Sequence, residues 1–125
     1  METKSDEVFI ESLSALTLAS SDMQRSVIFY ENLGFELARS SASLDFVTFR
    51  AGSQYLNITL EAPDRGPCWW GRAIFYVSDV DAMYRRVLAL GLKPDFEPRD
   101  APWGERYFHL SDPDGHALSF ARRNL

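Results

Sequence analysis

The chain has little cysteine and little histidine. Cys68 is the only cysteine among 125 residues, so no disulfide can form within the chain and no cysteine-rich metal site is available. Histidine occurs only at His109 and His116, which limits the imidazole groups for metal binding or acid–base chemistry. These shortages are typical of a protein of a reducing compartment, and we predict a cytoplasmic location.

Long apolar runs and clusters of positive charge are also missing. No segment approaches the roughly 18 uninterrupted apolar residues that a membrane span requires, and the polar residues 1–7 predict no signal peptide. Lysine and arginine never form a run longer than a pair, and the net charge is -5, which disfavours binding to phosphate backbones. We therefore predict no membrane association and no nucleic-acid partner, and the negative charge favours a neutral or cationic ligand.

The sequence does contain the material of one folded domain, which we assign to residues 1–125. Hydrophobic residues make up 46% and aromatic residues 14% of the chain. Both fractions are typical of a globular protein, and the aromatic share indicates an aromatic interior or pocket.

Two amphipathic helices form an internal repeat. The first begins after the capping pair Ser21-Asp22 and ends at Gly34, and the second begins after Ser78-Asp79 and ends at Gly91. Corresponding positions in the two segments are separated by a constant 57 residues. The chain is therefore predicted to consist of two similar halves.

Alternating apolar and polar residues predict the strands of both halves. Each half has one strand before its helix and three after it, a βαβββ unit, so the fold class is α+β with two tandem modules. We place module one at about 11–62, a linker at about 63–71 and module two at about 72–123. The Asp112-Pro113-Asp114-Gly115 sequence predicts the turn of the last hairpin. The predicted strands are 13–19, 35–40, 45–50 and 55–61 in module one, and 72–77, 93–97, 105–110 and 117–121 in module two.

Four motifs together resemble those of a known family. They are FYENLGF at 29–35, VSDVD at 77–81, PWGER at 102–106 and DPDG at 112–115. With this order and spacing, the chain from residue 13 onward resembles the glyoxalase, bleomycin-resistance and extradiol-dioxygenase superfamily. The resemblance implies a curled, mixed, cup-like sheet with the helices on its outer face and a small molecule in the cup. It also implies a homodimer.

Members of that superfamily with catalytic activity hold a divalent metal on strand side chains. By resemblance, the matching positions in this chain are Ala15, Asn57, Arg72 and Ser119. A methyl, an amide, a guanidinium and a hydroxyl group do not bind a catalytic metal ion. We therefore predict no metal and no cofactor. An unconventional metal site at His109 and His116, with Glu105 or Asp114, is a weaker alternative, because His116 is expected to be a solvated turn residue.

Alternation also separates the two faces of each predicted strand. Leu56, Ile58 and Leu60 are assigned to the helix side, together with Phe75, Val77, Phe108 and Leu110. The other side is expected to line the cup, and Trp69, Trp70 and Trp103 add stacking area on loops. The predicted ligand-binding residues are Tyr55, Asn57, Thr59, Glu61, Trp69, Arg72, Tyr76, Trp103, Tyr107, His109 and Ser119. Alternatively, these groups satisfy one another inside a filled barrel, with Arg72 paired to Glu61 or Asn57.

The leading functional hypothesis is a metal-free protein that sequesters an aromatic or cationic small molecule. The bleomycin-resistance branch of the resembled superfamily likewise lacks metal ligands, is acidic, and sequesters a cationic antibiotic between the subunits of a dimer. The alternative is a lyase, isomerase or dioxygenase of the same superfamily. In that case His109, the candidate catalytic residue, would perform metal-free acid–base chemistry with Glu61, Tyr76 or Tyr107. A third possibility is a purely structural or protein-interaction module.

Overall fold

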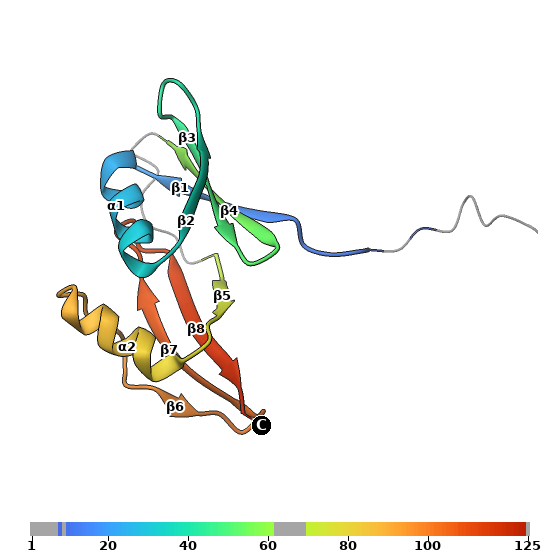
Figure 1. Ribbon diagram of the computed structural model, residues 1–125, viewed down its shortest axis with the longest axis vertical. Coiled ribbons are helices and arrows are strands. Elements are labelled where there is room, and N and C mark those ends of the chain that lie inside the picture. The colour runs from blue at the N-terminus through green and yellow to red at the C-terminus, as the bar shows by residue number, and fades with distance from the viewer. Residues whose placement is uncertain (1–7, 9, 62–69, 125) are drawn as a thin grey trace, which may run out of the picture.

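The computed structural model describes residues 8, 10–61 and 70–124 and contains two four-stranded sheets, each with one helix (Figure 1). The first sheet has the strand order β1-β4-β3-β2 and the second has the order β5-β8-β7-β6. In both sheets the strand before the helix pairs in parallel with the last strand of its module, and the other pairs are antiparallel. The predicted doubled βαβββ fold is confirmed.

Module one contains β1 (Ala15–Ser20), α1 (Met23–Leu33), β2 (Glu36–Ser40), β3 (Phe46–Ala51) and β4 (Gln54–Leu60). Module two contains β5 (Arg72–Tyr76), α2 (Val80–Ala89), β6 (Arg99–Asp100), β7 (Glu105–Ser111) and β8 (Ala117–Arg123). Both helices lie toward the same side of the two sheets in Figure 1. In the described residues no helix has the length and apolar character needed to cross a membrane.

Local sequence signals set the bounds of both helices. Asp22 caps α1 by accepting a hydrogen bond from the backbone N–H of Arg25, and Asp79 caps α2 in the same way through Ala82. Gly34 ends α1 with a φ of 111°, a left-handed conformation that glycine adopts without a Cβ penalty. The two caps are thus the structural counterpart of the repeat seen in the sequence.

The predicted strand at 93–97 is wrong. The strand of this region is β6, which has only two residues and pairs Arg99 with Tyr107. Pro94 and Pro98 lack the backbone N–H that a sheet ladder needs. Among the described residues, the backbone of the segment before β6 bonds to β7 through the N–H of Asp95, which donates to the carbonyl of His109 at 2.9 Å. This irregular segment carries Phe96 over the sheet, as described below.

One hydrophobic core joins both modules. Its largest fully buried side chains are Tyr30 and Phe49 in module one and Phe108 and Phe120 in module two. Alternation predicted the buried face of β4 correctly for Leu56 and Ile58, whereas Leu60, the last residue of the strand, is 44% exposed. The core fixes which face of each sheet remains open for a ligand.

Candidate functional site

The face of the module-two sheet that points away from α2 has small side chains along its central strand. Ala117, Ser119 and Ala121 of β8 alternate with Leu118 and Phe120, which lie in the core. In register with them stand larger side chains of β5 on one side and of β7 on the other. We call this surface the module-two open face, and its residues are Arg72, Ile74, Tyr76, Tyr107, His109, Ala117, Ser119 and Ala121. It brings together five of the predicted ligand-binding residues.

Aromatic rings gather over one side of the module-two open face. The ring of Tyr107 lies 5.1 Å from that of His109 and 5.6 Å from that of Trp103. Phe96 contacts Tyr107 and His109 at centroid distances of 5.6 and 4.9 Å. We call Phe96, Trp103, Tyr107 and His109 the aromatic cluster. Phe96 was not among the predicted site residues, because its segment was predicted to be a strand. Pro94 and Pro98 on either side of it were the signal in the sequence that this segment is irregular.

Glu105 anchors two aromatic side chains beside the cluster. The hydroxyl of Tyr76 and the indole N–H of Trp103 both donate hydrogen bonds to its carboxylate, the latter at 3.0 Å. The bond from Tyr76 and the bond from Trp103 lower the pKa of Glu105. The same carboxylate raises the pKa of Tyr76. Glu105 therefore stays ionised and fixes the orientation of Tyr76 and Trp103.

The charges around His109 are mostly positive. Its pKa is lowered, first by burial and then by the positive charge of Arg72, with Arg99 acting in the same direction and Asp95 opposing them. Arg99 itself lies over the ring of Phe96, at 3.6 Å from the centroid. His109 is therefore a neutral imidazole at pH 7, which can both donate and accept a hydrogen bond.

The predicted residues of module one belong to the other sheet, and three of them bond to side chains of their own module. The carboxamide oxygen of Asn57 accepts from the Thr48 hydroxyl at 2.7 Å, and its nitrogen donates to Thr17 at 3.2 Å. Thr59 donates to Glu61 at 3.3 Å. Glu61 has no ion pair with Arg72 among the described residues. The structure thus divides the predicted set between two sheets, and Trp69 lies outside the described residues.

The four residues that the resemblance assigns to the superfamily's metal positions do not fit a metal ion. Asn57 is occupied by its two hydrogen bonds on the first sheet, whereas Arg72 and Ser119 belong to the second. A guanidinium repels a cation, and the methyl of Ala15 offers no donor. Across residues 8, 10–61 and 70–124, no three His, Cys, Asp or Glu side chains are placed to hold an ion.

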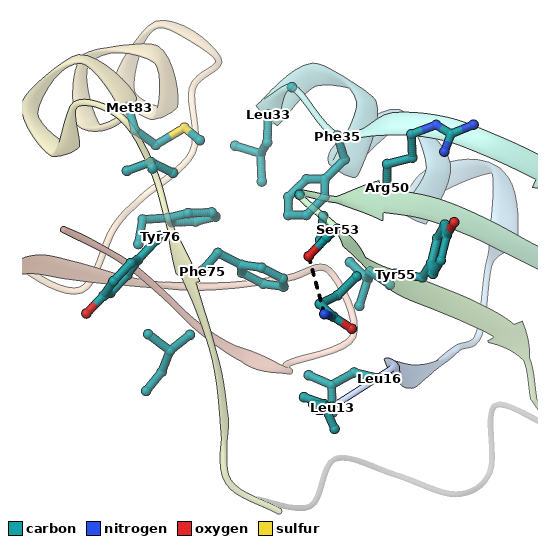
Figure 2. Close-up of a pocket in the computed structure, with 18 residues that line it drawn as sticks. Leu13, Leu16, Leu33, Phe35, Arg50, Ser53, Tyr55, Phe75, Tyr76 and Met83 are labelled. Carbon is teal, nitrogen blue, oxygen red and sulfur yellow. Dashed lines mark hydrogen bonds between the residues drawn. The ribbon is translucent and has the colours of Figure 1, made fainter. Parts of the chain in front are cut away.

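A cavity of about 510 Å³ lies between the modules (Figure 2). The hairpin from β3 to β4 and the end of α1 form one wall, and β5 with Met83 of α2 forms the other. Two of the predicted ligand-binding residues, Tyr55 and Tyr76, line it from opposite sides. Its walls are mainly apolar, and the volume is in the range of small-molecule pockets. Sequence reasoning missed this cavity, because its shape depends on how the two modules pack.

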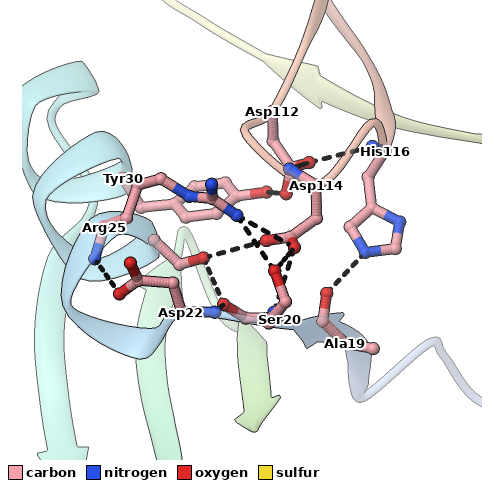
Figure 3. A network of polar contacts seen from close by, with 10 residues as sticks. Ala19, Ser20, Asp22, Arg25, Tyr30, Asp112, Asp114 and His116 are labelled. Atoms are coloured by element: carbon pink, nitrogen blue, oxygen red, sulfur yellow. Dashed lines mark hydrogen bonds and ion pairs between the residues drawn. The ribbon is translucent and has the colours of Figure 1, made fainter. Parts of the chain in front are cut away.

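The predicted turn before β8 is present and connects the modules (Figure 3). Asp112 is buried, accepts a 2.8 Å hydrogen bond from the Tyr30 hydroxyl, and has a pKa raised mainly by burial. Asp114 accepts from the backbone and side chain of Ser21 and pairs with Arg25 at 3.1 Å. The Asp112 turn is therefore a structural contact between the start of α1 and the second module.

His116 belongs to the same contact and is not a solvated turn residue as expected. Its Nε2 lies 2.7 Å from the carbonyl oxygen of Ala19, and its Nδ1 accepts a hydrogen bond from the indole of Trp70 at 2.8 Å. Because Nδ1 accepts, Nε2 carries the proton and donates to Ala19. Both ring nitrogens are thus committed to protein partners, which leaves His116 no free position for a metal.

The Asp114 contact predicts a pH dependence of stability. Burial alone would raise the pKa of Asp114, but the hydrogen bonds from Ser21 and Ser26 and the charge of Arg25 outweigh burial and lower it. A lowered folded-state pKa stabilises the fold above the unfolded value of about 4, and this contribution is lost as the pH falls through the folded-state pKa. We expect Asp114→Asn to lower the free energy of unfolding by about 1–2 kcal/mol at neutral pH. This value allows for the weak contribution of the ion pair with Arg25, whose side chain is exposed to solvent.

Urea unfolding of the wild-type protein and of Asp114→Asn, between about pH 7 and pH 2, measures the difference in their free energies of unfolding. This difference should shrink as the pH falls. Glu36→Gln is the matched control, because its ion pair with Arg50 is solvent-exposed on both sides and should contribute little. A difference for Asp114→Asn that persists undiminished at the lowest pH would contradict the charge-based explanation.

Comparison with known proteins identifies the family. The model of the Glyoxalase/Bleomycin resistance protein/Dioxygenase superfamily matches residues 12–120. The chain belongs to this superfamily. None of the curated proteins matches the sequence.

Several solved structures share the fold. TioX from Micromonospora sp. ML1 is 26% identical with a TM-score of 0.75, and the alignment covers 90% of this chain and 99% of TioX. A bleomycin resistance determinant encoded on the transposon Tn5 is 22% identical with a TM-score of 0.76, covering 92% of this chain and 100% of the determinant. Lactoylglutathione lyase from Agrobacterium tumefaciens is 21% identical with a TM-score of 0.73, and the alignment covers 90% of this chain and 93% of the lyase. Proteins of different function thus have this architecture.

Proposed function

We propose that the chain is a metal-free binding protein that holds a small aromatic molecule against the module-two open face. The observation that carries the proposal is the aromatic cluster, whose rings contact each other beside the small side chains of β8. Trp103 is 66% exposed and the adjacent Tyr76 is 56% exposed. Large aromatic side chains exposed together are typical of a binding surface, and their faces suit stacking on a planar ligand.

The unsuitable donor set at the superfamily's metal positions supports a metal-free site. We expect elemental analysis of the purified protein, after dialysis against Mn²⁺, Fe²⁺, Ni²⁺ and Zn²⁺ and removal of free ions, to find no stoichiometric metal. About one ion per chain would overturn this part of the proposal and direct attention to His109 and neighbouring carboxylates.

Binding of the neutral probe 2-naphthol, followed by tryptophan fluorescence, tests the location of the ligand. We expect Trp103→Ala, Tyr107→Ala and His109→Ala each to weaken binding about tenfold or more, because each removes a ring from the cluster. Ser53→Trp is the location control. Ser53 is exposed and lines the cavity between the modules, so the larger side chain obstructs that cavity, whereas no residue of the aromatic cluster lines it. Loss of binding in Ser53→Trp alone would place the ligand in the cavity.

A second candidate function is enzymatic, and the neutral state of His109 favours it. A neutral imidazole beside Tyr107 and near the Tyr76–Glu105 pair has the groups for metal-free acid–base catalysis, as in a lyase or isomerase. Turnover that survives exhaustive chelation and is lost in His109→Ala would establish this function. The candidate would be refuted by activity that requires an added metal.

We further propose a homodimer located in the cytoplasm. Exposed apolar side chains on both sheets, including Phe46, Ile74 and Tyr76, support burial against a second chain. Sedimentation equilibrium should give twice the mass of the chain. A monomeric mass would contradict the proposal.

A further inference from the structure

Arg72 is a half-buried cation without a carboxylate partner in the described part of the chain. In the described residues three arginines do form ion pairs with carboxylates, at 3.3 Å or less. They are Arg25, Arg50 and Arg106. Within residues 8, 10–61 and 70–124, the Arg72 guanidinium makes one hydrogen bond, a long one of 3.5 Å to the carbonyl oxygen of Leu118. Its remaining donors point to no protein acceptor among the described residues.

Such an arrangement costs free energy unless another group supplies the missing partner. A partly buried guanidinium loses hydration, and one long bond to a neutral carbonyl does not compensate for that loss. The planar guanidinium group has a geometry that matches a carboxylate, to which it donates two parallel hydrogen bonds. Arg72 is therefore suited to pair with an anionic group.

The surrounding charges favour an anion at this end of the module-two open face. The whole chain carries a net charge of -5, yet His109 is affected by two guanidinium groups, Arg72 and Arg99, and by one opposing carboxylate, Asp95. The carboxylate of Glu105 is engaged by Tyr76 and Trp103, and Arg123 is close enough to lower its pKa as well. Two of the three charges that act on His109 at the centre of the face are thus positive, although the protein is acidic.

Sheet register sets the distance between the cation and the aromatic cluster. Arg72 pairs with Ala117, whereas Tyr107 pairs with Ala121, four residues farther along β8. At about 3.3 Å per residue these rows are about 13 Å apart, with the row of His109 and Ser119 between them. An elongated planar molecule with its acidic group at one end fits this spacing, because the arginine side chain extends toward it.

We propose that the ligand of the module-two open face is an aromatic carboxylate, with its carboxylate on Arg72 and its ring against His109 and Tyr107. This inference rests on the proposed binding function and specifies the ligand's charge. It replaces the cationic ligand that the overall acidity favours, because the local charges differ in sign from the net charge.

Three probes of similar shape test the inference: 2-naphthoate, neutral 2-naphthol and cationic 2-naphthylmethylammonium. Wild-type protein at about pH 7.5 should bind 2-naphthoate about tenfold or more tightly than 2-naphthol, and should bind the cation most weakly. Arg72→Gln should remove the preference for 2-naphthoate over 2-naphthol. Arg72→Lys retains the charge without the planar group and should keep part of the preference.

Arg50→Gln is the matched control, because Arg50 is an exposed arginine of module one that is paired with Glu36. It should not change the affinity for 2-naphthoate. Equal affinity of wild-type and Arg72→Gln proteins for 2-naphthoate, or tightest binding of the cation, would overturn the inference and leave the binding function intact. Failure of all three probes to bind wild-type protein would overturn the binding function and this inference together.

Discussion

Phe120→Ala is expected to lower the free energy of unfolding by about 3–5 kcal/mol. Phe120 is fully buried on the core side of β8, with its ring 5.6 Å from that of Phe108 and 5.9 Å from that of Phe75. Truncation removes the apolar contacts and leaves a cavity that rigid strands on both sides cannot close. Urea unfolding at neutral pH, followed by circular dichroism, measures the loss.

Phe46→Ala is the matched control for this prediction. It removes the same side chain from a strand, but Phe46 is 39% exposed on β3 and should lose far less free energy of unfolding. A similar cost for the two variants would mean that β8 is not the centre of the core. The prediction would also fail if Phe120→Ala unfolded with the wild-type free energy.

Asp112→Ala is expected to lower the free energy of unfolding by about 2–3 kcal/mol. The Asp112 carboxylate accepts hydrogen bonds from the Tyr30 hydroxyl and from the backbone N–H groups of Asp114 and His116, at 2.8–2.9 Å. Its removal leaves the fully buried hydroxyl of Tyr30 without an acceptor and opens the turn that holds the modules together. The free energy of unfolding from urea titration is again the measurement.

Two further substitutions separate the contributions in this network. Tyr30→Phe should cost only about 1 kcal/mol, because Asp112 keeps its two backbone donors. Asp112→Asn retains an oxygen acceptor and should lie between Asp112→Ala and wild type. If Asp112→Ala is no more destabilising than Tyr30→Phe, the turn does not depend on the carboxylate.

The repeated elements of the fold could be predicted because their signals are local. Asp22 and Asp79 cap helices through bonds to residues three positions later, and Gly34 ends α1 through its own backbone conformation. The turn at residues 112–115 likewise depends on short-range bonds from Asp112 to its neighbours. Such interactions involve residues close in sequence, so the pattern of residue types is sufficient to find them.

The parts that could not be predicted depend on contacts between distant residues. His116 bonds to Ala19 and Trp70, which are far from it in sequence, and no local pattern indicates that pairing. The position of Phe96 over Tyr107 and His109 follows from a two-residue strand that prolines shorten. Glu61, one of the two partners for Arg72 in the alternative of a filled barrel, bonds instead to Thr59 on the other sheet.

The sequence by itself determined that this chain folds as two βαβββ modules, because the spacing of caps, turns and apolar residues encodes them. Only the tertiary structure decided which predicted residues share a surface. The packing of the modules creates the cavity between them and separates Asn57 from Arg72. The position of Arg72 beside a neutral His109, and hence the sign of the local charge, follows from strand register rather than from net charge.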